Sequence, residues 1–114
     1  MLIDGVNVLR KPFIDTLVKN AKTVTQLEGI VVFGSSVRED CTEKSDVDIL
    51  FIASAVDFDD TSYSLAILEL LQSCYSVQMV ETDFFTIRSL NDLFADTSFY
   101  RAIREDGYKY YKVR

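Results

Sequence analysis

The segment that decides the fold is residues 31–52, VVFGSSVREDCTEKSDVDILFI. An apolar run ends at Gly34 and Ser35, a charged loop follows, and a second apolar run carries Asp46 and Asp48. Aspartate is depleted in β-strands, so two aspartates in one apolar run oppose local propensity. This conflict suggests that the two carboxylates are kept for their chemistry.

Strand alternation predicts where these carboxylates point. Successive side chains of a strand face opposite ways, so Asp46 and Asp48 share one face while Val47, Ile49 and Phe51 face the core. Two carboxylates about 4 Å apart repel by roughly 4 kcal/mol at an effective dielectric near 20, unless a cation or proton relieves them. Mg²⁺ suits the pair, because it typically takes one or two carboxylates and completes its shell with water and phosphate oxygens.

The Gly34-Ser35 turn supplies the complementary half of such a site. The residues from Ser35 to Glu39 are typical of a helix start with a serine cap, and a strand-to-helix turn offers exposed amides and a hydroxyl to anions. Alone, a Gly-Ser pair is most often a plain turn, and Asp-x-Asp is most often a solvated strand edge or a turn cap. Their conjunction across one polar loop indicates a phosphate site with a divalent cation.

Composition narrows the class of protein. The chain has 114 residues, 48% of them hydrophobic and 26% charged, which predicts one globular domain over residues 1–114. A net charge of −6 argues against a broad nucleic-acid surface. Two cysteines without any histidine practically exclude zinc. No apolar run approaches the roughly 18 residues of a membrane helix, so we expect a cytoplasmic protein without membrane contact.

Periodicity predicts helices alternating with strands, the pattern of the α/β (α+β) class. A polar turn from Asp57 to Ser62 is typical of a helix cap and lacks the spacing of a calcium loop. The predicted helices are 13–25, 63–74 and one or two within 88–106, and the predicted strands are 30–33, 46–53 and 76–82, with an edge strand or tail after Gly107.

The motif resembles the minimal nucleotidyltransferases of the DNA polymerase β superfamily. In that family a strand is followed by Gly-Ser, two residues, arginine, a loop and Ser-Asp-x-Asp-hydrophobic. Here the pattern stands as Gly34-Ser35-Ser36-Val37-Arg38 and Ser45-Asp46-Val47-Asp48-Ile49. The resemblance implies a nucleotidyltransferase fold, in which helices pack on one face of a small mixed β-sheet.

The resemblance also implies an activity. Gly34 and Ser35 would bind the triphosphate of an NTP, most naturally ATP, and Asp46 and Asp48 would hold Mg²⁺ or Mn²⁺. Arg38 would support the loop or the phosphates, with a surface ion pair as its alternative role. The implied reaction moves a nucleoside monophosphate to a hydroxyl acceptor and releases pyrophosphate.

One departure from the family leaves the activity open. Members capable of transfer carry a third carboxylate on the next strand, and the matching position here is Gln78. Glu81 and Asp83 are substitutes, but by alternation each would need a bulge or loop to reach the metals. The alternative to an enzyme is therefore a catalytically inert binding module that acts by protein–protein contact. Glu39, directly after the arginine, adds negative charge beside the expected triphosphate site.

The resemblance further implies partners. Small stand-alone members of the family are often antitoxins paired with a helical HEPN-type toxin, so a protein acceptor is expected here. A partner chain or a homodimer would complete the site. The sequence identifies neither the acceptor nor the preferred base.

Overall fold

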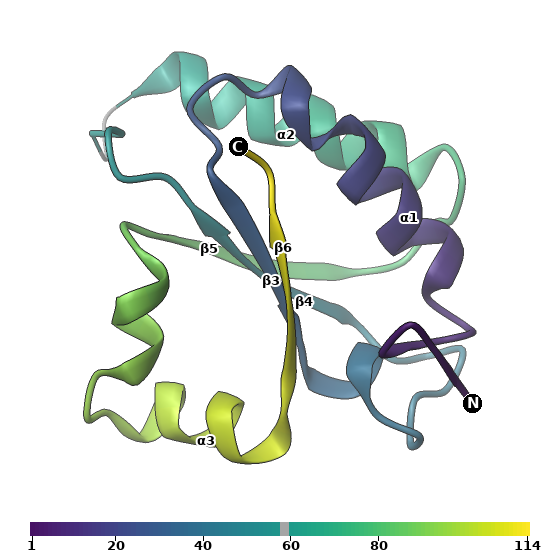
Figure 1. Ribbon diagram of the computed structural model, residues 1–114. Coiled ribbons are helices and arrows are strands. Elements are labelled where there is room, and N and C mark those ends of the chain that lie inside the picture. The colour runs from purple at the N-terminus through teal and green to yellow at the C-terminus, as the bar shows by residue number, and fades with distance from the viewer. Residues whose placement is uncertain (58–59) are drawn as a thin grey trace.

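The computed structural model describes residues 1–57 and 60–114, and a mixed β-sheet lies between helices on its two faces (Figure 1). Within these residues the main sheet has four strands in the order β5-β4-β3-β6. Strand β3 is antiparallel to β4 and β6, whereas β4 and β5 are parallel. The predicted α+β class is confirmed. The strands are β3 (Gly29–Phe33), β4 (Val47–Ile52), β5 (Thr82–Ile87) and β6 (Tyr108–Lys112).

The two long helices cover one face of the sheet, as expected. They are α1 (Lys11–Asn20) and α2 (Thr61–Tyr75). Pro12 lies in the first turn of α1, where its missing N–H costs nothing. The helix predicted to reach residue 25 is shorter than expected, because the chain continues after it as a 3₁₀ helix, η1 (Ala21–Thr23). Beneath these helices lie the odd-numbered side chains of β4, all fully buried: Val47, Ile49 and Phe51.

The even-numbered side chains of β4 support a second, smaller layer. Leu50 and Ile52 pack with Leu93 and Ile103, which come from η3 (Leu90–Phe94) and α3 (Ser98–Asp106). The two helices are separated near residues 95–97, and Gly107, with φ of +97°, ends α3 as predicted. This layer covers the face of the sheet opposite α1 and α2 (Figure 1).

The third predicted strand, 76–82, is wrong in position. Val77 and Met79, which gave the pattern its alternation, are 54% and 82% exposed in an irregular connection after α2. The strand is instead β5, whose sequence TDFFTI is rich in the β-branched and aromatic residues that favour strands. The strand therefore begins where the predicted one ends.

Two further segments complete the chain. A short hairpin, β1 (Leu2–Ile3) and β2 (Val6–Asn7), precedes α1. Of the predicted capping turn from Asp57 to Ser62, residues 58 and 59 lie outside the described residues, and Asp60 caps α2 by accepting the Tyr63 N–H at 3.1 Å.

Cys41 and Cys74 are buried and unbridged, and burial raises the pKa of the Cys74 thiol to about 11, which fits a packing role. In the described part of the chain, no helix has the length and apolarity to cross a membrane.

Candidate active site

The turn after β3 requires a glycine. Gly34 has a φ of +73°, and a Cβ added there would lie 2.2 Å from Oδ2 of Asp48. Glycine alone adopts this φ freely and lets the backbone approach the carboxylate so closely. The turn continues as the 3₁₀ helix η2 (Gly34–Val37), so the α-helix predicted to start at Ser35 is wrong. The turn can therefore bind an anion through its own amides and the Ser35 hydroxyl, but it has no long helix dipole.

The two predicted aspartates flank the first residue of β4. Asp46 precedes Val47, and Asp48 lies inside the strand. In the sheet, Asp48 pairs with Phe33 of β3 on one side and with Asp83 of β5 on the other. The carboxylate of Asp48 is thus close to both the glycine turn and a second acidic residue on the neighbouring strand.

The assignment of the third-acid position to Gln78 does not fit the structure. Gln78 lies before β5, and its Nε2 donates to the Leu9 carbonyl at 2.7 Å, away from the aspartates. Glu81 also precedes the strand, and its carbonyl accepts the Val47 N–H. Asp83 needs no bulge: directly paired residues of parallel strands share a face, so it stands beside Asp48. The error follows from the misplaced strand.

Charge accumulates around Asp48. Burial, followed by the charges of Asp83 and Asp46 and a hydrogen bond with Asp83, raises the pKa of Asp48 to about 6, although Arg38 opposes the shift. Arg38 itself donates from Nε to Oδ1 of Asp40 at 3.0 Å and lies 3.9 Å from Asp106. One half-buried arginine therefore faces several acids, and the excess negative charge favours a cation.

An open cleft of about 390 Å³ brings most of the predicted site residues together. Asp83 is not part of the cleft wall and stands next to it on the edge strand β5. The predicted residues that line the cleft are Gly34, Ser35, Arg38, Asp46 and Asp48. The turn and the paired acids therefore converge on one cleft, as the motif indicated.

The opposite wall of the cleft comes from α3, which the sequence did not associate with the site. Phe99 and Asp106 line it from the two ends of this helix. Phe99 also makes edge contacts with Phe33 and Phe85, with ring centroids 6.0 and 5.9 Å apart. No local signal in residues 98–106 marks them as site residues, because their place depends on how α3 packs on the sheet.

The donor set suits a divalent cation bound in an open manner. In residues 1–57 and 60–114, no three His, Cys, Asp or Glu side chains are grouped so that they could hold a metal ion by themselves. An open arrangement is what Mg²⁺ ordinarily uses, with one or two carboxylates and the remaining positions filled by water or phosphate. The carboxylate oxygens of Asp46 and Asp48, and the raised pKa of Asp48, would suit such an ion.

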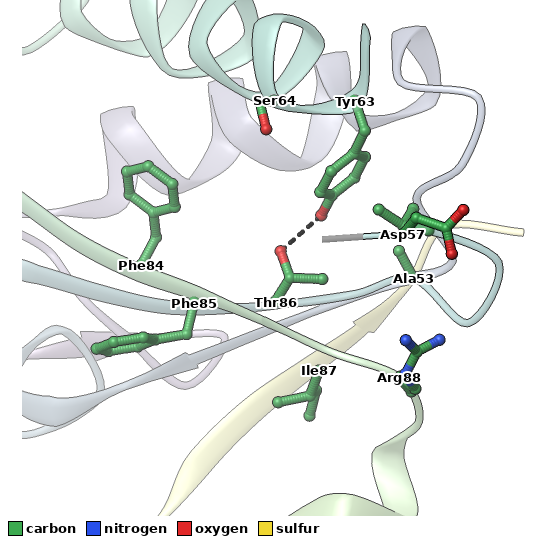
Figure 2. A pocket seen from close by; sticks show the side chains of 10 residues that line it. Ala53, Asp57, Tyr63, Ser64, Phe84, Phe85, Thr86, Ile87 and Arg88 are labelled. Atoms are coloured by element: carbon green, nitrogen blue, oxygen red, sulfur yellow. Dashed lines mark hydrogen bonds between the residues drawn. The ribbon is translucent and has the colours of Figure 1, made fainter. Parts of the chain in front are cut away.

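A second cavity of about 330 Å³ lies toward the other end of β5. Figure 2 shows Phe84 and Phe85 on the β5 side of this cavity and the hydrogen bond between Tyr63 Oη and Thr86 Oγ1, 2.8 Å long. Its described lining is mostly apolar and lacks a group of carboxylates, so phosphoryl chemistry is better supported in the first cleft.

Comparison with known protein families identifies the fold. Residues 15–103 match the family described as Polymerase beta, Nucleotidyltransferase. The chain therefore belongs to this family, and the superfamily expected from the motif is confirmed.

Comparisons beyond the family match are weaker. A solved structure from Sulfolobus solfataricus, provisionally described as a nucleotidyltransferase, is 17% identical, with a TM-score of 0.44. The alignment covers 83% of this chain and 86% of that one. Among curated protein sequences, none matches this chain significantly. The assignment thus rests on the family match, and the antitoxin subtype remains a prediction.

Proposed function

We propose that this chain transfers a nucleoside monophosphate from an NTP, with ATP as the first candidate, to a hydroxyl group of a protein. The observation that carries the proposal is the pairing of Asp48 with Asp83 across β4 and β5. This pairing brings a third carboxylate to Asp46 and Asp48, whereas the sequence predicted Gln78 at that position.

Each residue of the cleft that the sequence predicted has a role in the proposed reaction. The amides of the Gly34 turn and the Ser35 hydroxyl bind oxygens of the triphosphate, and Arg38 adds positive charge beside them. Asp46 and Asp48 would hold Mg²⁺ or Mn²⁺, which when bound would neutralise charge on the phosphates. The positive φ of Gly34 allows the turn to approach these acids without a side chain between them.

The step itself is an in-line displacement. The acceptor oxygen forms a bond to the α-phosphorus, while the bond from that phosphorus to the oxygen bridging toward the β-phosphorus breaks and pyrophosphate leaves. Asp83, the register partner of Asp48, would take the proton of the attacking hydroxyl, the role of a general base. A glutamine at this position could not have accepted that proton at neutral pH.

A protein acceptor is supported by an aromatic surface next to the cleft, defined here as Phe85 and Phe99, whose ring centroids lie 5.9 Å apart. These side chains are 55% and 45% exposed, and Phe99 also lines the cleft. Exposed aromatic groups that adjoin an active site are typical of partner-binding surfaces. We propose that a helical HEPN-type toxin binds there and presents its hydroxyl, which would make this chain the antitoxin of the pair.

The alternative, an inert binding module, rested on the missing third acid. With Asp83 beside Asp48 that argument loses its basis, so the enzyme is the better-supported function. The binding module remains as an outcome of the test.

The test is transfer of label from [α-³²P]ATP with Mg²⁺ or Mn²⁺ to a co-purified HEPN-type protein. We expect label on the acceptor with the wild type and none with Asp48→Asn. Tight partner binding that is indifferent to Asp48→Asn, with no label transferred, would establish the binding module instead.

A further inference from the structure

A buried arginine lies behind the cleft and was not recognised from the sequence. Arg10, just before α1, is 3% exposed. Among the ion pairs of the described residues, none involves Arg10. A charged group buried in this way needs other partners, because desolvation of an unpaired charge costs several kcal/mol.

The partners of Arg10 are main-chain carbonyls of one turn. Its Nη2 donates to the carbonyl oxygens of Thr42, Glu43 and Ser45 at 3.1, 2.9 and 2.6 Å, and its Nε donates to Ser45 O at 3.3 Å. The turn is also closed on itself, since the Ser45 N–H donates to Thr42 O at 3.0 Å and the Thr42 N–H donates to Ser45 Oγ at 2.9 Å. One guanidinium therefore holds the whole turn from residue 42 to residue 45.

The position of this turn gives it functional meaning. Ser45 lines the cleft and is bonded directly to Asp46. On the other side of Asp46, the Val47 N–H donates to Glu81 O and fixes the start of β4 against the segment leading into β5. Asp46 itself lies outside the strand, so its main chain is held by Arg10 before it and by β4 after it.

Two further residues secure the same network. The buried Asn7 donates from Nδ2 to Arg38 O at 2.7 Å, which ties the other end of the 38–45 loop to the N-terminal segment. The Leu9 carbonyl accepts both Arg10 Nη1 at 3.1 Å and Gln78 Nε2 at 2.7 Å. Gln78, which the sequence assigned to the third-acid position, thus shares a main-chain acceptor with the arginine.

We propose that Arg10 is a positioning residue that fixes Asp46 for binding of the divalent cation. The inference rests on the proposed function, because it takes Asp46 to be a metal ligand. Groups that orient ligands from behind typically contribute 10- to 100-fold in metal affinity. A lysine at this position keeps the charge but loses the planar fork that reaches three carbonyls at once.

The chain offers a matched control in Arg114. Its Nη1 donates to Val24 O at 2.9 Å and Leu27 O at 2.6 Å, and its Nη2 donates to Lys22 O at 2.7 Å. These are the same kind of hydrogen bonds as at Arg10, made here by an exposed residue. However, this arginine lies near the Gly29 end of β3, whereas the cleft lies at the Phe33 end.

The experiment measures Mn²⁺ binding to the metal-free protein by electron paramagnetic resonance, with thermal unfolding of each variant recorded alongside. We expect Arg10→Lys to bind Mn²⁺ about 10-fold more weakly than the wild type, and Arg114→Lys to bind it as the wild type does. As a second variant, Thr42→Val loosens the same turn, because it removes the Oγ1 that accepts the Lys44 N–H at 3.3 Å and lies 3.4 Å from Ser45 Oγ. We expect about a 3-fold loss, less than the roughly 10- to 100-fold typical of groups that orient a ligand directly, because Arg10 still holds the turn.

The outcomes separate this inference from the proposed function. Wild-type protein that binds no Mn²⁺ would overturn both. A folded Arg10→Lys variant with unchanged Mn²⁺ affinity would overturn the positioning role alone, as would equal losses in Arg10→Lys and Arg114→Lys. If Arg10→Lys does not fold, unchanged affinity in Thr42→Val overturns the inference.

Discussion

The β3–β4 strand pair has a carboxylate near each end, and the fold shifts the pKa values of the two in opposite directions. At the far end, Glu28 accepts the Ser54 N–H, and this hydrogen bond holds the pKa of Glu28 below its ordinary value. At the cleft end, burial and neighbouring acids raise the pKa of Asp48 to about 6. The first carboxylate is stabilised as an anion by the fold, whereas the second is destabilised.

This difference indicates where the chain gives up stability for chemistry. A carboxylate used for structure finds a donor, as Glu28 does. A carboxylate kept close to other acids without a matching donor is typical of sites that bind a cation or move a proton. The same sheet therefore contains its own control for the proposed site.

The largest effect is expected from the two glycines at the ends of β3. A Cβ at Gly34 meets the Asp48 carboxylate at 2.2 Å with φ of +73°, so Gly34→Ala should destabilise the fold by about 3 kcal/mol or more and abolish transfer. A Cβ at Gly29 meets only the mobile ends of Tyr110 and Ile52, at 2.9 and 3.2 Å. We expect Gly29→Ala to cost about 1 kcal/mol and to keep activity. Urea unfolding and label transfer measure both; equal effects at the two ends would contradict the close approach at Gly34.

The second prediction concerns which acid near β5, Asp83 or Glu81, takes part in transfer at the cleft end of the sheet. Asp83→Asn should lower the rate of transfer about 10²- to 10³-fold, because a general base is lost. Glu81→Gln should change it less than about 3-fold, since Glu81 precedes the strand, whose pairing with β4 begins at Thr82. Initial rates at saturating ATP compare the two variants. A larger loss in Glu81→Gln than in Asp83→Asn would mean that the register of β5 does not define the site.

The part of this site that sequence could predict is local. Strand, turn and strand follow one another within residues 31–52, so Gly34 and Asp48 were expected to meet, and they do. The alternation of β4 likewise predicted that Ile49 and Phe51 face the core. Both inferences needed only the order of residues along neighbouring strands.

The rest depends on distant parts of the chain. Strand β5 follows β4 only after the whole of α2, so its register does not follow from neighbouring residues. In the connection between α2 and β5, the exposed Val77 and Met79 alternate with polar residues as they would in a strand. The wall contributed by Phe99 depends on the packing of α3 against the second face of the sheet. Arg10 gave no signal because its partners are main-chain carbonyls, which any sequence provides.

The third prediction is that removing a charge at the cleft stabilises the metal-free protein. The pKa of Asp48 rises from 3.8 to about 6 on folding, so the native state binds the proton more tightly and stability falls as pH rises between these values. Asp48→Asn lacks this penalty. Two pKa units correspond to about 3 kcal/mol at most, and solvent screening of the half-buried group leaves about 1 kcal/mol. We expect a Tm gain of about 4–8 °C at pH 7.5 by calorimetry with chelator present.

The pH series checks the cause of that gain. It should vanish near pH 3.5, where Asp48 is protonated in both the folded and unfolded states. Adding Mn²⁺ at neutral pH should narrow the difference, because only the wild type keeps the full set of carboxylate ligands. A gain that persists unchanged at pH 3.5 would trace to packing rather than to charge.

The smallest effect, and opposite in sign, is expected at the far end of the sheet. Folding lowers the pKa of Glu28 from its ordinary value of 4.5, so this carboxylate stabilises the protein above that pH and the contribution is lost as pH falls through the folded-state value. Glu28→Gln should therefore lower Tm slightly at pH 7.5 and leave it unchanged in acid. The amide oxygen of glutamine can still accept the Ser54 N–H, which keeps the loss smaller than the gain in Asp48→Asn.

The test compares Tm curves of the two single variants and the double variant between pH 3.5 and 7.5. The Tm changes of the two single variants should have opposite signs, and they should add in the double variant, because the two sites lie at opposite ends of β4. Curves that move in the same direction would show that the two carboxylates do not differ in the way the structure indicates.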